Sequence, residues 1–217
     1  MSHLPIPPLR APNIAKVSIA LLLALSVVSS RAQAAPADAA EVVRSFYATL
    51  LNTMTNGPPL GPSGRYAALK PAVRKTFNIP LMARVAIGPG WGSLTLDQQQ
   101  QVTEALARYV AATYADRFDN YSGEKLQVAG EQPFGADAIV QTRIVKSKGE
   151  PVGINYLVQR TATTWQISDV YLDGTISELA TRRADFSAIL RDRGIGGLIA
   201  ALNRKADLLS ARSAKTS

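Results

Sequence analysis

The feature that most constrains the fold is a strand whose apolar residues change faces halfway along it. Residues 164–172 are rich in β-branched and aromatic side chains, which predicts a strand. On a regular strand Trp165 and Ile167 lie on one face, whereas Val170 lies on the other. A strand with a period of two can bury both sets only if it bends, so we predict a β-bulge near Ser168–Asp169.

A turn and a helix follow this strand directly. Asp173 and Gly174 are residue types typical of a tight turn. Thr175 and Glu178 have the spacing of a capping box, which predicts that a helix begins near Thr175. The apolar residues that keep helical spacing after it are Ile176, Leu179, Ala180, Phe186, Ile189 and Leu190. This helix can lie across the bent strand, and a site is expected in the space between them.

Residues 1–34 have the pattern of a secretory signal peptide. A basic segment precedes an apolar run, Val17–Val28, which is too short for a comfortable membrane span. Residues 32–34 form an A-x-A cleavage site, so the mature chain is expected to begin near Ala35. The alternative is that this N-terminal segment is not cleaved and anchors the protein to the membrane. No cysteine follows the apolar run, which excludes a lipoprotein.

The predicted mature chain contains neither cysteine nor histidine, since the only histidine, His3, lies in the predicted signal peptide. These absences exclude Ser-His-Asp and Cys-His catalysis and zinc held by His or Cys, so no cofactor or metal is expected. The net charge is +8, and basic and acidic residues are interspersed along the chain. We therefore expect a solvated surface rather than a nucleic-acid interface, although positive charge favours encounters with anionic lipid headgroups.

The N-terminal half of the mature chain is predicted to be helical, over about residues 37–120. A broad apolar stripe predicts the first helix over 37–56, with Asp38 as its cap. Residues 57–64 are rich in glycine and proline, which predicts a loop. The helix that follows is expected to be kinked or split at Pro71.

Two further helices are predicted before the sheet. Asn78 and Pro80 predict the start of a short helix that ends at Gly88. Thr95 and Gln98 form a second capping box, which opens a helix that runs to about residue 120. The aromatic residues at its lower end are Tyr109, Tyr114, Phe118 and Tyr121. Such a stripe usually packs in a core, but tyrosines also suit the wall of a ligand site that is wet at its mouth.

Over residues 122–172 the apolar period changes to two. Strands are predicted at 124–128, 138–147, 152–159 and 164–172. Their short connections predict an antiparallel meander, so the fold class is α+β, with a curved four-stranded sheet and packed helices. The C-terminal helices are expected at 175–209, with a break among the glycines of residues 194–197, and they complete a single domain over 35–209. Residues 210–217 are expected to be a disordered tail.

Two pairs of charged residues are candidates for chemistry or binding. Asp169 and Asp173 could run acid–base chemistry, but no nucleophile, base or set of metal ligands accompanies them. Structural roles are therefore favoured, with Asp173 in the turn and Asp169 bonded to backbone or to an arginine. Arg182 and Arg183 begin a basic run on the following helix. They predict either a solvated helix face or a contact with a headgroup or partner.

Three groups of residues carry a resemblance that spans about Val42 to Leu209. They are Arg84, Ile87-Gly88 and Trp91; then Tyr121-Ser122-Gly123 before Leu126; then Trp165, Asp169-Val170 and Gly174, with Ser177, Arg183 and Phe186 after them. In this order they resemble the toluene-tolerance/MlaC family of exported lipid-binding proteins. The segment Gly174–Ser177 is one residue longer than the family's usual Gly-x-Ser, and this version is similar to the hopanoid-biosynthesis-associated branch, HpnM.

The resemblance implies an NTF2-like fold with a helical subdomain and a periplasmic lipid carrier without catalytic residues. It implies phospholipid or hopanoid as cargo, an inner-membrane ABC-transporter complex as partner and, in MlaC-like systems, an outer-membrane lipoprotein. Acyl chains would enter a slot between the curved sheet and the helices. The side chains expected to face this slot are Tyr109, Tyr114, Phe118, Val140, Ile144, Ile154, Tyr156, Val158, Val170, Leu172, Phe186 and Leu190.

Two other functions remain open. A one-sided curved sheet must cover its concave face either with its own side chains or with a ligand. If its own side chains fill the space, the protein is a structural or adaptor module that docks on a membrane lipid-transport complex without cargo. A hydrolase or isomerase on the same scaffold is least favoured, because the mature chain lacks histidine.

Overall fold

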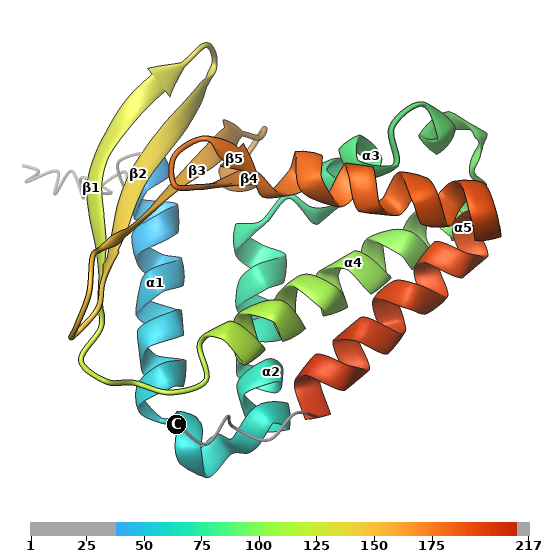
Figure 1. Ribbon diagram of the computed structural model, residues 1–217. Coiled ribbons are helices and arrows are strands. Elements are labelled where there is room, and N and C mark those ends of the chain that lie inside the picture. The colour runs from blue at the N-terminus through green and yellow to red at the C-terminus, as the bar shows by residue number, and fades with distance from the viewer. Residues whose placement is uncertain (1–37, 212–217) are drawn as a thin grey trace, which may run out of the picture. The chain divides into compact units, whose positions relative to one another are not determined.

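A curved antiparallel sheet forms one side of the computed structural model, which describes residues 38–211. Its strands lie in chain order and are β1 (Lys125–Phe134), β2 (Asp137–Val145), β3 (Val152–Arg160), β4 (Trp165–Leu172) and β5 (Ile176–Ser177). The sheet therefore has five strands rather than the predicted four (Figure 1). The predicted signal peptide and residues 212–217 of the predicted tail lie outside the described residues.

The predicted bulge in β4 is confirmed. Leu157 on β3 pairs with Asp169, and the next residue, Val158, pairs with Ile167, so Ser168 is the extra residue. Residues paired across an antiparallel ladder point to the same face. The bulge therefore allows Ile167 and Val170 to share the inner face of the sheet.

The strand β1 is longer than predicted and also carries a bulge. Its register with β2 shifts between Val128 and Gly130, and the strand continues to Phe134. The second half of β1 is mostly exposed, so it lacks the apolar alternation by which a strand is recognised from sequence. β1 and β2 form a long hairpin at the edge of the sheet (Figure 1).

The helix α1 (Ala39–Thr55) packs on the inner face of the sheet. Its predicted cap is confirmed, because the Asp38 side chain accepts a hydrogen bond from the Glu41 backbone N–H at 2.6 Å. The Glu131 carboxylate on β1 accepts from the Ala40 N–H at 2.9 Å. Two carboxylates thus satisfy free N–H groups in the first turn, where the helix dipole favours negative charge.

The predicted loop at residues 57–64 is wrong, because α2 spans Gly57–Thr76. Proline is compatible with the first turn of a helix, where its missing N–H is not needed. The helix kinks at Gly61, whose φ of 62° and ψ of 178° are not helical. Pro71 lies inside the second part of α2, where the backbone remains helical, so α2 is split at Gly61 and not at Pro71 as predicted.

The predicted starts of the next two helices are confirmed. Asn78 Oδ1 accepts from the Leu81 N–H at 3.2 Å at the start of α3 (Ile79–Ile87), which ends at Gly88 with a φ of 71°. A short 3₁₀ helix, η1 (Gly88–Ser93), follows it. Thr95 and Gln98 form both hydrogen bonds of a capping box at the start of α4 (Leu96–Arg117).

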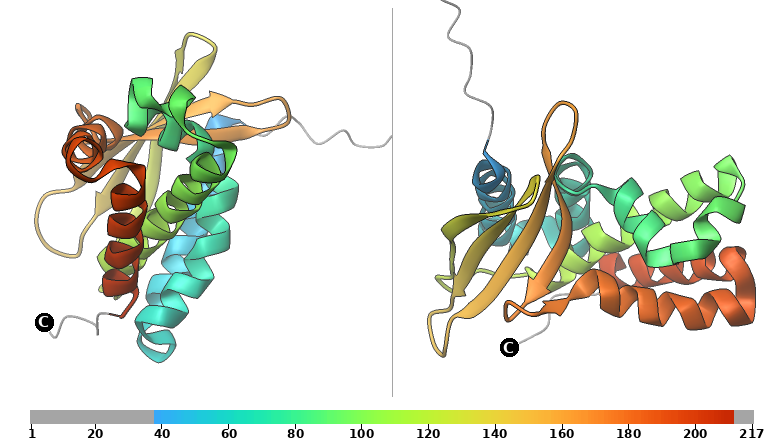
Figure 2. Two further views of the ribbon diagram at one scale, coloured as in Figure 1. Left: turned by 90° about the vertical axis from the view of Figure 1, so that its right-hand side faces the viewer. Right: turned by 90° about the horizontal axis from the view of Figure 1, so that it is seen from above.

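The helix α5 (Glu178–Ala211) consists of two halves that meet at Gly194, where φ is 61°. After this residue the chain turns back and runs beside α4 (Figure 2). The predicted break among the glycines near residue 194 is thus confirmed. Ser210 and Ala211, which were predicted to begin a disordered tail, belong to α5 instead.

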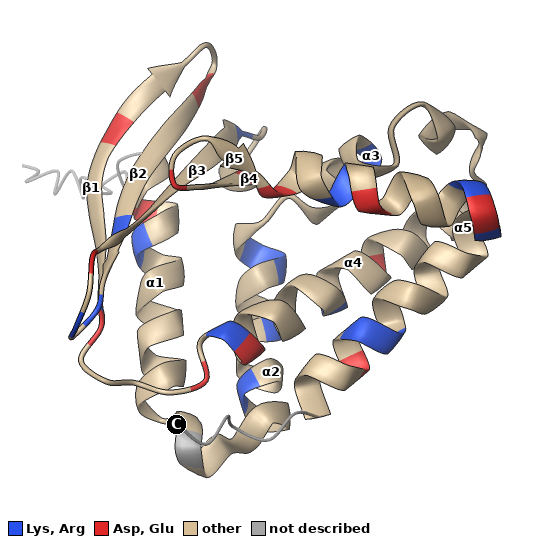
Figure 3. Ribbon diagram, in the orientation of Figure 1, with Lys and Arg blue, Asp and Glu red and all other residues tan. Residues whose placement is uncertain are grey.

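Charged residues are scattered over the described part of the chain. Basic and acidic residues are both spread over the helices and the sheet (Figure 3), although the charged residues of α2 and α3 are all basic. The described residues, 38–211, belong to one compact unit. Within residues 38–211, none of the helices combines the length and apolarity that a membrane span requires.

Candidate functional site

A cavity of about 240 Å³ lies between the sheet and the helices α3, α4 and α5. Its wall is mostly apolar and is formed by Phe77, Met82, Val110, Tyr114, Phe118, Ile144, Val152, Ile154, Tyr156, Val170, Leu172 and Leu179. Its polar members are Thr113, Arg117, Asp169, Glu178 and Arg182. A concave apolar space with a few polar groups is the usual form of a small-molecule site.

The bulge in β4 aligns two strands on the cavity wall. Val170 pairs with Tyr156, and Leu172 pairs with Ile154, so all four side chains point to the inner face. Without the extra residue at Ser168, every residue of β4 on one side of it would turn to the outer face. The curved strand predicted from sequence is therefore the element that builds this wall.

Seven of the twelve predicted slot residues line the cavity: Tyr114, Phe118, Ile144, Ile154, Tyr156, Val170 and Leu172. The structure places the other five elsewhere. Val140 and Val158 are fully buried in the core and do not line the cavity. Phe186 and Leu190 lie on α5, about two and three turns beyond the lining residue Leu179.

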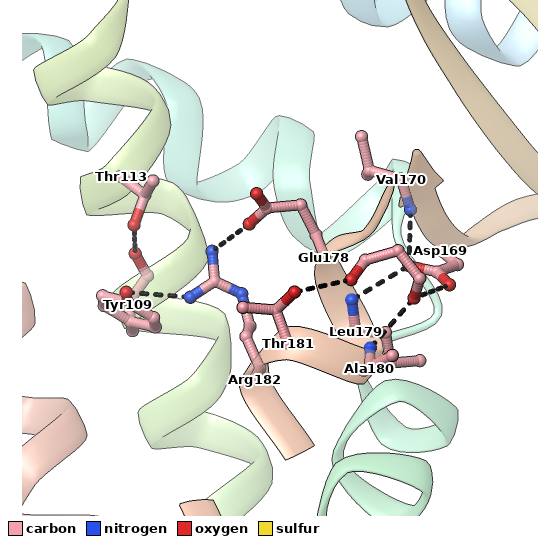
Figure 4. A network of polar contacts seen from close by, with 10 residues as sticks. Tyr109, Thr113, Asp169, Val170, Glu178, Leu179, Ala180, Thr181 and Arg182 are labelled. Carbon is pink, nitrogen blue, oxygen red and sulfur yellow. Dashed lines mark hydrogen bonds and ion pairs between the residues drawn. The ribbon is translucent and has the colours of Figure 1, made fainter. Parts of the chain in front are cut away.

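The fifth of these residues, Tyr109, lies on α4 outside the cavity wall and faces α5. Its hydroxyl accepts a hydrogen bond from Arg182 Nη1 at 2.8 Å, and the guanidinium of Arg182 lies 4.8 Å from its ring centroid. Arg182 Nη2 also donates to Glu178 at 3.0 Å (Figure 4). Only 14% of the Arg182 side chain is exposed, so this arginine ties α5 to α4 beside the cavity.

Several lining residues were not predicted from the sequence. Phe77 and Met82 come from the junction of α2 and α3, which meets β4 through a parallel bridge between Phe77 and Ile167. The periodicity of a helix does not indicate which strand its end contacts. Leu179 belonged to the predicted apolar stripe of α5 and could have been chosen from that pattern.

Asp169 holds the start of α5 against the sheet. One carboxylate oxygen accepts from the Val170 N–H at 2.7 Å and from the Leu179 N–H at 3.1 Å, and the other accepts from Ser177 Oγ at 2.6 Å (Figure 4). Ser177 Oγ in turn accepts from the Ala180 N–H at 2.9 Å. Both oxygens of Asp169 are therefore used structurally, as favoured from sequence.

The capping box predicted at Thr175 and Glu178 is wrong. The Thr175 N–H donates to the Leu172 carbonyl at 3.2 Å, and Asp173 and Gly174 both have positive φ. These are the features of a type I′ hairpin turn, which returns the chain into β5. The helix therefore begins three residues later than predicted, with Ser177 as its cap.

A row of buried hydroxyls lies behind the cavity wall. The Thr142 hydroxyl donates to the Ile154 carbonyl at 2.6 Å, and the Tyr47 hydroxyl lies 2.6 Å from Thr142 Oγ1. The ring of Tyr156 packs edge-on against that of Tyr47, with ring centroids 5.9 Å apart. Burial raises the pKa of Tyr47, Tyr114 and Tyr156, and the neighbouring phenols raise the pKa of Tyr156 further.

The comparisons with known proteins agree with this architecture. A family profile described as MlaC protein matches residues 44–204. The chain belongs to the MlaC family. A phospholipid-binding protein from Ralstonia solanacearum, solved in complex with a phospholipid, has a similar fold with a TM-score of 0.68. The two chains are 23% identical, and the match covers 80% of this chain and 99% of that one.

Two residues of the MlaC family pattern contact each other between α3 and α5. A Cβ atom placed at Gly88 would lie only 2.9 Å from Arg183 Nη2, so Arg183 packs directly on the backbone of this turn. Gly88 also has a φ of 71°, which side chains other than glycine disfavour. Arg183, predicted as a headgroup or partner contact, therefore lies against the end of α3.

We expect the free energy of unfolding to fall as the pH rises above about 10. An unfolded tyrosine has a pKa of 10.0, whereas burial raises the pKa of Tyr114 and Tyr156 in the folded state. The stabilisation that comes from burying these neutral phenols is therefore fully present below the pKa of the unfolded state. It is lost as the pH rises toward the raised pKa of the folded state. Urea unfolding at several alkaline pH values measures this slope. Tyr156→Phe should reduce it, whereas the exposed Tyr121→Phe should leave it unchanged.

Proposed function

We propose that this MlaC-family protein is a non-enzymatic carrier that holds the apolar part of a phospholipid between its sheet and its helices. The observation that carries the proposal is the apolar cavity enclosed by β3, β4, α4 and the start of α5. The phospholipid in the structure of the similar Ralstonia solanacearum protein supports this choice of cargo. The role of Asp169 in holding α5 supports a binding role over a catalytic one.

The size of the cavity indicates how cargo is held. A volume of about 240 Å³ is below the usual range of ligand sites, about 300–1,000 Å³. It accommodates a segment of one acyl chain rather than a whole two-chain lipid. Loading of a whole lipid therefore requires the first half of α5 to move away from α4. The contact of Arg182 with Tyr109 and the turn at Gly194 are the tie and the hinge available for this motion.

Transport follows from the energetics of release. Each buried CH₂ group contributes about 0.8 kcal/mol, so a lipid held by many such groups leaves into water very slowly. A carrier needs a docking partner that lowers this barrier. We propose that residues 1–34 direct export of the chain to the periplasm and are then cleaved off. There the protein exchanges lipid with an inner-membrane ABC-transporter complex. In this scheme an outer-membrane lipoprotein is the partner at the other membrane.

A hopanoid is the second candidate cargo. It is favoured by the segment Gly174–Ser177, which is one residue longer than the usual Gly-x-Ser and similar to the hopanoid-linked HpnM branch. In the structure this segment comprises the second half of the type I′ turn and the strand β5, next to the start of α5. The longer turn therefore changes the part of the molecule that borders the cavity.

Native mass spectrometry of the purified protein, followed by lipid extraction, tests the carrier function. We expect phospholipid or hopanoid to co-purify, or to be accepted from vesicles of phosphatidylethanolamine and phosphatidylglycerol with or without hopanoid. A protein that neither co-purifies with these lipids nor accepts them would contradict the proposal. That result would favour an adaptor that docks on a lipid-transport complex without cargo.

A further inference from the structure

The exposure of the lining residues shows where the cavity opens. On β3, Tyr156 is 1% exposed, Ile154 is 8% exposed and Val152 is half-buried. Exposure increases in the same way along α4, from the buried Val110 to Arg117, which is the one exposed residue among those that line the cavity. The closed end of the cavity therefore lies at Val110 and Tyr156, and Arg117 marks its mouth.

One face of α4 runs from the closed end of the cavity to its mouth. The lining residues on this face follow one another at helical spacing and are Val110, Thr113, Tyr114 and Arg117. Val110 and Arg117 are separated by about 10 Å along the helix axis. A lipid whose acyl chain reaches Val110 therefore leaves its headgroup beside Arg117.

The other charged residues of the cavity wall already have partners. Asp169 accepts three hydrogen bonds at the start of α5, and Glu178 and Arg182 form an ion pair at 3.0 Å. Among the ion pairs found within residues 38–211, none includes Arg117. Its guanidinium is therefore available at the mouth of the cavity, where it can donate two parallel hydrogen bonds to an anion.

The usual structural role of a cation at this position is filled by another arginine. A basic residue in the last turn of a helix offsets the negative end of the helix dipole. At the end of α4, the buried side chain of Arg65 on α2 donates from Nε to the Ala115 carbonyl at 3.1 Å. Arg117 therefore has a role to play outside the helix itself.

We propose that Arg117 binds the phosphate of a phospholipid whose acyl chain occupies the cavity, and that this contact favours phospholipid over a neutral hopanoid. The inference rests on the proposed carrier function and specifies its cargo. The carboxylate of a free fatty acid shares the required chemistry, because it is also an anionic acceptor for a guanidinium. An uncharged lipid with the same acyl chain lacks this contact.

Two single-chain lipids that differ only in the headgroup test the contact. Lysophosphatidylglycerol carries a phosphate, whereas a monoacylglycerol with the same chain is uncharged. Displacement of a fluorescent monoacylglycerol from the delipidated protein, at lipid concentrations too low for micelles, gives both affinities. We expect lysophosphatidylglycerol to bind about threefold to tenfold more tightly, as for a partly exposed hydrogen-bonded ion pair. This ratio should fall between about 0.1 M and about 1 M salt, which screens an exposed charge.

Substitutions of two exposed arginines assign the preference to its residue. Arg117→Gln should bring the ratio of the two affinities close to one, whereas Arg117→Lys keeps the charge and should retain part of the preference. Arg143→Gln removes the same charge from β2, on the face of the sheet opposite the inward-facing Thr142, and should leave the ratio unchanged. Thermal unfolding of each variant checks that the fold is intact.

The possible failures separate this inference from the carrier function. Equal binding of both lipids to the wild-type protein, or an unchanged ratio in Arg117→Gln, would overturn the headgroup contact and leave the carrier function intact. A free fatty acid of the same chain that binds more tightly than lysophosphatidylglycerol would assign the contact to a carboxylate and contradict the choice of phospholipid. Failure of all three lipids to bind would count against the cavity as a lipid site altogether.

Discussion

Replacement of Val170 by tryptophan is expected to reduce the lipid bound by the purified protein by more than tenfold while the fold survives. Val170 lies beside Tyr156 on the strand wall of the cavity, and an indole ring at this position projects into the space of about 240 Å³. Loss of room for about two CH₂ groups costs roughly 1.6 kcal/mol, which exceeds a tenfold change in affinity. The added atoms enter empty space, so overpacking is limited. Lipid extraction with quantitative mass spectrometry, together with circular dichroism, measures both outcomes.

Two matched substitutions control this result. Val85→Trp makes the same change on the exposed face of α3 and should leave lipid loading unchanged. Val158→Trp lies in the fully packed core outside the cavity and should instead destabilise the fold, by about 1–3 kcal/mol or more. Normal loading of a folded Val170→Trp variant would show that lipid does not enter this cavity.

The elements predicted correctly are those set by local chemistry. Asp38, Asn78 and Thr95 cap their helices because each side-chain oxygen accepts from the N–H three residues later. The bulge at Ser168 was predicted because two apolar sets of opposite phase cannot otherwise share one buried face. In each case the cause and the effect lie within a few residues of each other.

The elements predicted wrongly are those whose local sequence is compatible with more than one backbone conformation. A segment rich in glycine and proline, such as 57–64, can form either a loop or the first turns of a helix. Here it is helical, and α2 packs against α1 and α4. Thr175 and Glu178 match a capping box, but the two positive φ values at residues 173 and 174 form a hairpin turn instead. Ser177 is then free to cap α5.

The cavity wall was predictable where the pattern specifies both face and position. The alternation of β3 placed Ile154 and Tyr156 on the inner face, and both line the cavity. An apolar stripe on a helix specifies which face is buried but not which turn of the helix reaches the cavity. Phe186 was therefore expected in the cavity, although it is buried about two turns beyond the lining residue Leu179. Phe77 reaches the cavity through a bridge to Ile167, 90 residues later in the chain, and no local pattern reports such a contact.

Replacement of Asp169 by alanine is expected to cause the largest loss of stability, about 3 kcal/mol or more. The substitution leaves the Leu179 N–H and Ser177 Oγ without the acceptor that holds the first turn of α5 to the bulge. It also removes a buried negative charge from a helix N-terminus, where the dipole favours it. For a domain of this size, 3 kcal/mol corresponds to a fall in Tm of roughly 6–12 °C.

Thermal and urea unfolding of three variants measure the contribution of this carboxylate. Asp169→Asn keeps an oxygen for the Val170 and Leu179 N–H groups but loses the second acceptor, which Ser177 Oγ uses, so its stability should fall between wild type and Asp169→Ala. Asp185→Ala, on the exposed face of α5, should change the free energy of unfolding by less than about 0.5 kcal/mol. If Asp169→Ala lost no more stability than Asp185→Ala, the bulge would not hold the helix. The start of α5 would then be free to leave the sheet without breaking this contact, and the energy barrier to opening the cavity would lie at the tie between Arg182 and Tyr109 instead.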